Sequence, residues 1–190
     1  MDKLTIDQLH KLRISIFDNA ESLYKEAKLL NENGFYERAY LLAYFACEEL
    51  GKIPIVVGAI GQLIQGNEVD WKKVRKRFRS HKAKVESEDF HHYVFGIEPD
   101  LLRNSDVKWL DEQKKQSRAK VDRKNESTYV DVIDGETILP AEQVSSDDAV
   151  EMIETAFNSL KAHWQSESHT NPIIVAANKA NSADAKKPRG

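Results

Sequence analysis

The segment from residue 36 to residue 64 constrains the fold more than any other part of the chain. Apolar side chains fall on nearly every side of the helix that this segment predicts. A helix without a polar face has to be surrounded by other elements, so the segment predicts the centre of a helical bundle. Pro54 lacks an amide N–H and its ring crowds the carbonyl of Leu50, which predicts a kink between Gly51 and Pro54.

A well-delimited helix is expected before this segment. Thr5 and Gln8 have the spacing of a capping box, and Gly34 suits the left-handed position just beyond a helix end. Between them, apolar residues recur at steps of three and four, the period of one helix face: Leu9, Leu12, Ile16, Ala20, Leu23, Ala27 and Leu30.

The remaining chain completes an all-α prediction. Asp134-Gly135 stands between β-branched residues and predicts a type I′ hairpin turn. Residues 166–190 are small or polar without periodicity, so we expect a disordered C-terminal tail. The expected fold is one antiparallel helical bundle over residues 3–165 with a small β-hairpin insertion. Its further helices are predicted over residues 71–87, 106–124 and 145–165.

Several features bear on location. The most apolar stretch, residues 53–64, is shorter than the roughly eighteen residues of a membrane-spanning helix. The N-terminus lacks the apolar run of a signal peptide. Cys47 is the single cysteine, so an internal disulfide is excluded. We expect a cytoplasmic protein with no membrane partner, in which Cys47 is a buried, inert thiol.

The net charge of −3 conceals two oppositely charged stretches. Residues 131–154 hold eight acids and no Lys or Arg. Residues 71–85 hold eight cations and no acid: Lys72, Lys73, Arg75, Lys76, Arg77, Arg79, Lys82 and Lys84. The average charge speaks against nucleic-acid binding over the whole surface, but not against one basic patch. The two stretches are either solvated faces that attract each other, or the basic one meets an anionic ligand.

Glu48, Glu49 and Lys52 place three charges on the otherwise apolar central segment. Such charges are costly to bury unless they are paired. Lys52 follows the two glutamates by four and three residues, so either can meet it on one helix face. These residues form either an ion-pair cluster that fixes helix packing or a group that orients a catalytic side chain.

His81 is the histidine within the basic stretch. Trp71, Val74, Phe78 and His81 follow one another at steps of three and four, which predicts a buried or partner-facing stripe. A histidine on such a stripe is most often a core residue. The surrounding cations, however, disfavour a protonated imidazole and would leave a neutral base beside groups able to hold a phosphate.

No metal or cofactor is expected. His91 and His92 are adjacent, so on a helix their side chains point about 100° apart. Without a matching carboxylate or cysteine spacing, this pair does not predict a metal site, and no zinc motif, phosphate-binding glycine loop or nucleophile elbow is present.

Three blocks of the sequence resemble the AbiV-type abortive infection proteins, which belong to the HEPN superfamily of helical bundles. They are residues 19–53, which include the run EELGK, residues 78–84 (FRSHKAK) and residues 127–140, which include YVD. The likeness covers most of residues 15–160 and implies a HEPN-like bundle.

The resemblance also implies an activity and a partner. Many HEPN proteins form two-fold dimers and act as metal-independent endoribonucleases with an Arg, four to six residues and a His. Arg75 and His81 match this motif with five residues between them, Lys76 matches only a looser form, and Arg77 does not match. The resemblance therefore implies a homodimer that cleaves RNA as an antiphage effector, with a phage-encoded protein as a possible activator.

In this implied mechanism, His81 takes the proton of an RNA 2′-hydroxyl and Arg75 stabilises the charge on the phosphate. Arg77, Lys82 and Lys84 would bind the substrate, while Glu48, Glu49 and Lys52 would orient the site. On one regular helix Arg75 points roughly 120° away from His81. Either the helix unwinds near residues 79–80 or two copies share one site, and the stripe that contains His81 favours the second.

Two other functions remain open. The first is a non-catalytic bundle that binds a phage protein, a nucleotide or an RNA. The second is a DNA-binding regulator that uses residues 71–85, which ranks last because the stretch lacks a helix-turn-helix pattern and base-reading Asn or Gln.

Overall fold

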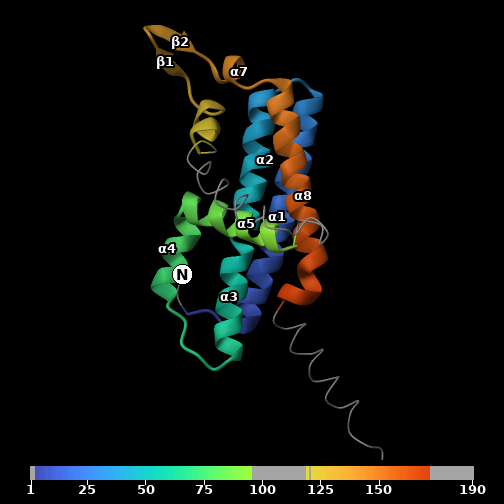
Figure 1. Ribbon diagram of the computed structural model, residues 1–190, viewed down its shortest axis with the longest axis vertical. Coiled ribbons are helices and arrows are strands. Elements are labelled where there is room, and N and C mark those ends of the chain that lie inside the picture. The colour runs from blue at the N-terminus through green and yellow to red at the C-terminus, as the bar shows by residue number, and fades with distance from the viewer. Residues whose placement is uncertain (1–2, 96–118, 120, 172–190) are drawn as a thin grey trace, which may run out of the picture.

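The computed structural model describes residues 3–95, 119 and 121–171. Figure 1 shows long helices packed side by side, with a hairpin projecting at one end. The elements are α1 (Ile6–Glu32), α2 (Tyr36–Leu50), α3 (Ile53–Ile64), α4 (Trp71–Arg79), α5 (His81–Phe95), β1 (Asp131–Ile133), β2 (Glu136–Ile138), α7 (Pro140–Gln143) and α8 (Ser146–Thr170), with a further helical segment at residues 121–126. The predicted all-α bundle with a β-hairpin insertion is confirmed.

The first helix has the predicted ends. The Thr5 side chain accepts a hydrogen bond from the Gln8 backbone at 3.2 Å, and Gln8 Oε1 accepts one from the Thr5 backbone at 2.9 Å. At the other end, Gly34 adopts a φ of +80°, which a glycine reaches without strain. The capping box and the glycine therefore fix a helix of 27 residues.

The expected kink near Pro54 is a complete interruption between two helices. α2 ends at Leu50, and α3 begins at Ile53 after the turn formed by Gly51 and Lys52. Pro54 lies in the first turn of α3, where its missing N–H leaves no helix hydrogen bond unmade.

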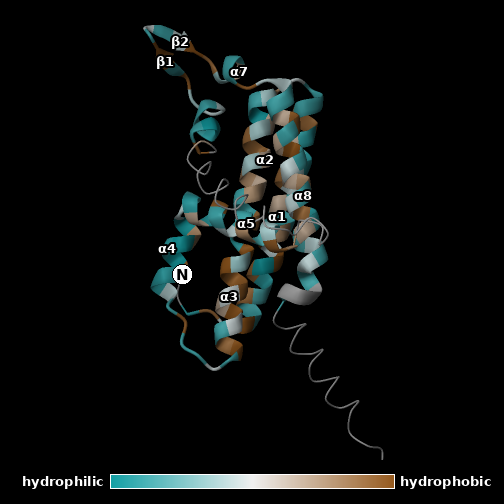
Figure 2. Ribbon diagram, viewed as in Figure 1, coloured by the Kyte–Doolittle hydropathy of each residue, from teal (hydrophilic) through white to brown (hydrophobic). Residues whose placement is uncertain are grey.

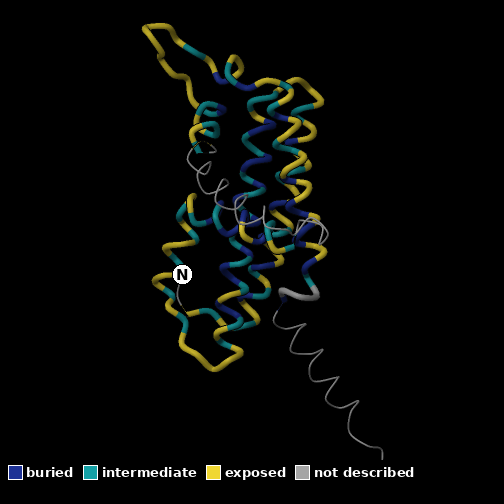
Figure 3. Tube along the Cα trace, in the orientation of Figure 1, coloured by how far each residue is buried: buried dark blue, intermediate teal, exposed yellow. Residues whose placement is uncertain are grey.

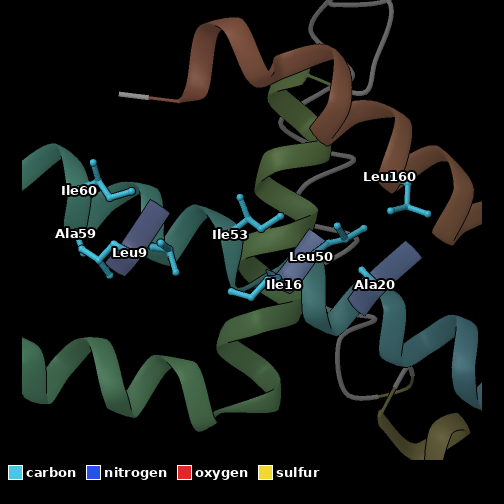
Figure 4. Packing of buried hydrophobic residues seen from close by; sticks show 9 residues of the cluster. Leu9, Ile16, Ala20, Leu50, Ile53, Ala59, Ile60 and Leu160 are labelled. Carbon is cyan, nitrogen blue, oxygen red and sulfur yellow. The ribbon is translucent and has the colours of Figure 1, made fainter. Parts of the chain in front are cut away.

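The main core lies where α1, α2, α3 and α8 meet. Figure 4 shows Leu9 of α1 beside Ala59 and Ile60 of α3, and Ile16 of α1 beside Leu50 of α2, with Ile53 from α3 and Leu160 from α8 in the same cluster. Hydrophobic α3 stands beside strongly hydrophilic α4 in Figure 2. The central position predicted for residues 36–64 follows from this packing.

The prediction of one helix over residues 71–87 is wrong. Ser80 is extended, with φ −85° and ψ 114°, and separates α4 from α5. Its hydroxyl accepts a hydrogen bond from the Ala83 backbone at 3.2 Å, so Ser80 caps a new helix. The stripe of Trp71, Val74 and Phe78 packs against the core, but it does not continue into α5.

The hairpin and the last helix also carry the expected local signals. Asp134 and Gly135 adopt φ values of +53° and +84°, as a type I′ turn requires. Asp131 pairs with Ile138, and Ile133 pairs with Glu136. Ser145 and Asp148 form the capping box that starts α8.

One expected boundary, the end of the last helix, differs from the structure. α8 continues to Thr170, beyond the expected end at residue 165, and both Ser166 and Asn171 are buried. The remainder of the expected tail, residues 172–190, lies outside the described residues, as do residues 106–118 and 120 of the helix expected over 106–124. Among the helices of the described part of the chain, none combines the length and apolarity needed to cross a membrane.

Candidate functional site

A close approach between two backbones brings α5 onto the end of α2. A Cβ atom added to Gly51 would lie 2.1 Å from the carbonyl oxygen of Lys84, far inside contact distance. Gly51 has ordinary helical angles, so a missing side chain, and not backbone freedom, is what this position requires. The glycine of the EELGK run thereby places the first turn of α5 beside the last turn of α2.

Three ionisable side chains meet at this contact. Nδ1 of His81 lies 2.6 Å from Oε1 of Glu48, and Nζ of Lys84 lies 2.7 Å from Oε2 of the same carboxylate. Glu48 and Lys84 are buried, whereas the His81 side chain is 54% exposed. The buried alternative for His81 is therefore wrong, because the break at Ser80 turns it toward solvent, whereas the partner-facing alternative stays a prediction.

The electrostatics of Glu48 fix the role of the histidine ring. Burial by itself would raise the pKa of Glu48, but hydrogen bonds from Lys84 and His81 outweigh burial and lower it below its usual value. An ionised carboxylate can only accept hydrogen bonds, so Nδ1 of His81 carries the donated proton. In the neutral ring Nε2 then holds the available lone pair.

Of the two glutamates that helical spacing places within reach of Lys52, Glu49 is the one that forms the ion pair with it. Its ammonium also lies 5.4 Å from the centre of the Phe78 ring, within cation–π range. Because Phe78 belongs to α4, the contact between Lys52 and Phe78 connects the turn after α2 to α4.

The motif residues Arg75 and His81 lie on different helices, on either side of Ser80. The roughly 120° between Arg75 and His81 that one regular helix would impose therefore does not apply, because the helix is broken at Ser80. Arg75 is half-buried in α4. The Arg77 guanidinium donates to the Ser87 hydroxyl at 3.0 Å, which links α4 to the second turn of α5.

The two lysines expected to bind substrate differ in exposure. The Lys82 side chain is 74% exposed, with its ammonium 3.8 Å from Glu86. Lys84 is buried against Glu48 and acts within the protein as the partner of that carboxylate.

A second carboxylate–histidine cluster, which the sequence did not indicate, joins α5 to α8. Nε2 of His163 lies 2.7 Å from Oε2 of Glu88, and the His91 ring stacks on the His163 ring with centroids 3.6 Å apart. Nε2 of His91 lies 3.0 Å from the Ser166 hydroxyl. The four residues are buried. Glu88 precedes His91 by three residues, a one-turn spacing that sequence reasoning overlooked.

Burial and the neighbouring groups together shift the pKa values of His91 and Glu88 in this cluster. Burial lowers the pKa of His91 to about 3, with a further contribution from the neighbouring His163. For Glu88, burial would raise the pKa, but the charge and hydrogen bond of His163 outweigh burial and lower it.

Glu88, His91 and His163 also offer nitrogen and oxygen atoms within 4.8 Å of one another, the range of a metal-ligand set. The ring planes of the two histidines differ by only 2°. A metal ion lies in the plane of each imidazole that binds it, along the nitrogen lone pair. Two rings stacked face to face therefore cannot both bind one ion without rotating, and the arrangement is that of a hydrogen-bonded core.

A cavity of about 450 Å³, lined in part by Glu48, lies between α2, α5 and α8. Cys47 lines it and is only half-buried, so the expectation of a fully buried thiol is wrong. Tyr40 and Tyr44 line the same cavity, and burial raises the pKa of Tyr40 to about 12. Burial, together with the negative charge of Glu48, likewise raises the pKa of Tyr44.

The helical bundle with its hairpin insertion is consistent with a HEPN-type fold. The family model of the AbiV proteins within this class matches residues 8–161. The chain therefore belongs to the AbiV family and is an abortive-infection HEPN-domain protein. No curated protein and no solved structure matches it.

Proposed function

We propose that this protein is a metal-independent endoribonuclease in which His81 is the general base. The observation that carries the proposal is the contact between Nδ1 of His81 and the buried carboxylate of Glu48. A carboxylate that accepts from one ring nitrogen fixes the tautomer and leaves the other nitrogen to take a proton, as in hydrolases with a histidine base.

In the proposed reaction, Nε2 of His81 removes the proton of an RNA 2′-hydroxyl. The 2′-oxygen attacks the adjacent phosphorus, the bond to the 5′-oxygen breaks, and that oxygen takes up a proton. The products are a 2′,3′-cyclic phosphate and a 5′-hydroxyl end. The need for a 2′-hydroxyl restricts the substrate to RNA.

Cations near His81 would stabilise the negative charge that develops on the phosphoryl oxygens. We assign this role to Arg75, with Arg77 and the exposed Lys82 binding the flanking phosphates. Lys84 would keep Glu48 ionised from within the protein. Glu49 and Lys52 would act indirectly, by holding α4 through Phe78.

The test is cleavage of a labelled RNA by the purified protein in EDTA. The expected result is a ladder of products with cyclic phosphate ends, no cleavage of the DNA of the same sequence, and loss of cleavage in His81→Ala. His10→Ala, which removes a histidine of α1, is the matched control. Cleavage that persists in His81→Ala would exclude His81 as the base.

The exposed cations of α4 favour a second candidate, an RNA-binding module that does not cut its ligand. α4 has no buried residue, and Lys72, Lys73 and Lys76 are all exposed. In that case His81→Ala would still protect cells from phage, whereas reversing the charge of Arg75 and Arg77 would abolish protection and salt-dependent RNA binding.

A further inference from the structure

The cavity between α2, α5 and α8 has more acidic than basic side chains in its lining. Five carboxylates and one guanidinium line it: Glu48, Glu88, Asp89, Asp148, Glu151 and Arg123. The guanidinium is already paired, at 2.7 Å with Asp148 and at 3.0 Å with Glu126. A cavity lined mainly by one sign of charge concentrates ions of the opposite sign, so this cavity attracts cations.

Glu88 offers a carboxylate oxygen to a ligand in this cavity, and its side chain is only 5% exposed. Oε2 accepts a hydrogen bond from His163 at 2.7 Å, whereas Oε1 has no partner at hydrogen-bond geometry within the described part of the chain. The Ser159 hydroxyl is close enough to help lower the pKa of Glu88, but it does not meet that geometry with Oε1. An acceptor buried without a donor is costly, so a ligand that donates to Oε1 would bind favourably.

The acidic groups of the cavity lie toward two separate ends. Glu151 lines it from the second turn of α8, and Ser159, which lies beside Glu88, follows eight residues later. At the rise of an α-helix, this separation corresponds to about 12 Å along α8. The lining also contains a hydrophobic cluster and a methionine packed on it: Tyr40, Tyr44, Val85 and Met152. The cavity therefore combines two acidic ends with an apolar wall.

The cavity is accessible from the side of α8. Figure 3 shows α2 buried or half-buried along most of its length, whereas α8 carries many exposed positions. Glu151 and Thr155, which line the cavity from α8, are both exposed. A ligand can therefore enter past α8 without separating the helices.

These features match a linear aliphatic polyamine, in which short hydrocarbon chains separate ammonium groups. One ammonium group would donate to Glu88 and another to Glu151, while the hydrocarbon between them would pack on the apolar wall. The aromatic faces of Tyr40 and Tyr44 would add cation–π attraction.

A divalent metal ion fits this cavity less well. Such an ion needs several ligand atoms around one point. Among the described residues, the one group of three carboxylate, histidine or cysteine side chains with ligand atoms that close together is Glu88, His91 and His163, whose two imidazole rings are stacked. The carboxylates at the two ends of the cavity are too far apart to share an ion.

We propose that the cavity between α2, α5 and α8 binds a linear aliphatic polyamine, with one ammonium group at Glu88 and another at Glu151. This binding requires neither RNA nor the catalytic role of His81, so its test is independent of the proposed ribonuclease activity.

Titration calorimetry of the full-length protein with spermidine, at physiological ionic strength, tests the site. The expected result is one spermidine bound per chain. Butylamine should bind about tenfold or more weakly, because it makes one charged contact in place of two. Mg²⁺ at the same ionic strength should neither bind at this site nor displace spermidine. Absence of spermidine binding, or displacement by Mg²⁺, would overturn the proposal.

Variants of exposed residues on α8 locate the binding to this cavity. Thr155→Arg places a cation in the lining and should abolish binding, whereas Glu151→Gln should weaken it about two- to fivefold, as the loss of an exposed ion pair does. Glu154→Gln removes the same charge from an exposed position of α8 outside the lining and is the matched control. Thermal unfolding by circular dichroism checks that each variant is folded. Unchanged binding in folded Thr155→Arg, or equal affinities of Glu151→Gln and Glu154→Gln, would exclude the site.

Discussion

Helix α5 contributes one residue to each of two carboxylate–histidine pairs, which have nearly the same distance but opposite surroundings. The Glu48–His81 pair spans 2.6 Å and the Glu88–His163 pair spans 2.7 Å. His81 is half-exposed among cations, whereas His163 is buried under the ring of His91. The distance between a carboxylate and an imidazole therefore does not distinguish catalysis from packing. Access to solvent and to positive charge differs between the two pairs, and for this reason we propose chemistry at the first pair and stability at the second.

The largest expected effect is on the exposed pair. His81→Ala should lower RNA cleavage by about 10²–10⁴-fold, the usual contribution of a general base. The melting temperature should stay close to that of the wild-type protein, because the removed ring is half-exposed. A coupled measurement of cleavage and thermal unfolding would contradict the comparison if stability fell together with activity.

The buried pair should respond in the opposite way. His163→Ala leaves the carboxylate of Glu88 buried without its partner, which should cost about 3–5 kcal/mol of unfolding free energy. Urea denaturation measures this loss, and His163→Ala combined with Glu88→Ala should recover part of it. Cleavage per folded molecule should remain. An unchanged denaturation midpoint would show that the Glu88–His163 contact does not stabilise the fold.

A smaller effect is expected from the glycine that positions the exposed pair. Gly51→Ala would force α5 away from α2 and should destabilise the protein by about 1–3 kcal/mol, as overpacking does. Because the shift acts on the turn that carries His81, cleavage should fall as well. Gly58→Ala is the matched control, since its added Cβ meets nothing within 4 Å. Equal behaviour of the two variants would exclude the close approach as the cause.

Lowering the pH should protonate the buried cluster of Glu88, His91 and His163 and gradually lower the free energy of unfolding. The pKa of His91 is about 3 in the folded protein, below its usual 6.5, so the unfolded chain binds the extra proton between these values. Unfolding free energy should therefore fall by roughly 1.4 kcal/mol per pH unit as the pH drops from 6.5 toward 3. The lowered pKa of Glu88 acts in the same direction below about pH 4.5. Denaturation of His91→Gln over this range should show a shallower slope.

Local signals made much of the fold predictable from sequence. The capping boxes at Thr5 and Ser145 and the Asp134-Gly135 turn each depend on residues within a few positions of one another. The break at Ser80 also has a local cause, the serine cap, but the helical spacing from Trp71 to His81 concealed it.

The site was harder to predict because its contacts join distant parts of the chain. Glu48 selects His81 and Lys84, which lie 33 and 36 residues away, over the nearby Lys52. Glu88 and His163 are separated by 75 residues. Residue types identified the candidates, but helix packing decided which of them became partners.

Ser80, which separates α4 from α5, also sets the direction of the electric field at His81. Because Ser80 starts a new helix, the aligned peptide dipoles of α5 place their positive end at His81. In a continuous helix over the same residues, His81 would lie in mid-helix, where the electric field of the helix at the imidazole ring is weak. In the proposed reaction, the interruption would add a backbone contribution to phosphate binding that neutralising the nearby lysines and arginines would leave in place.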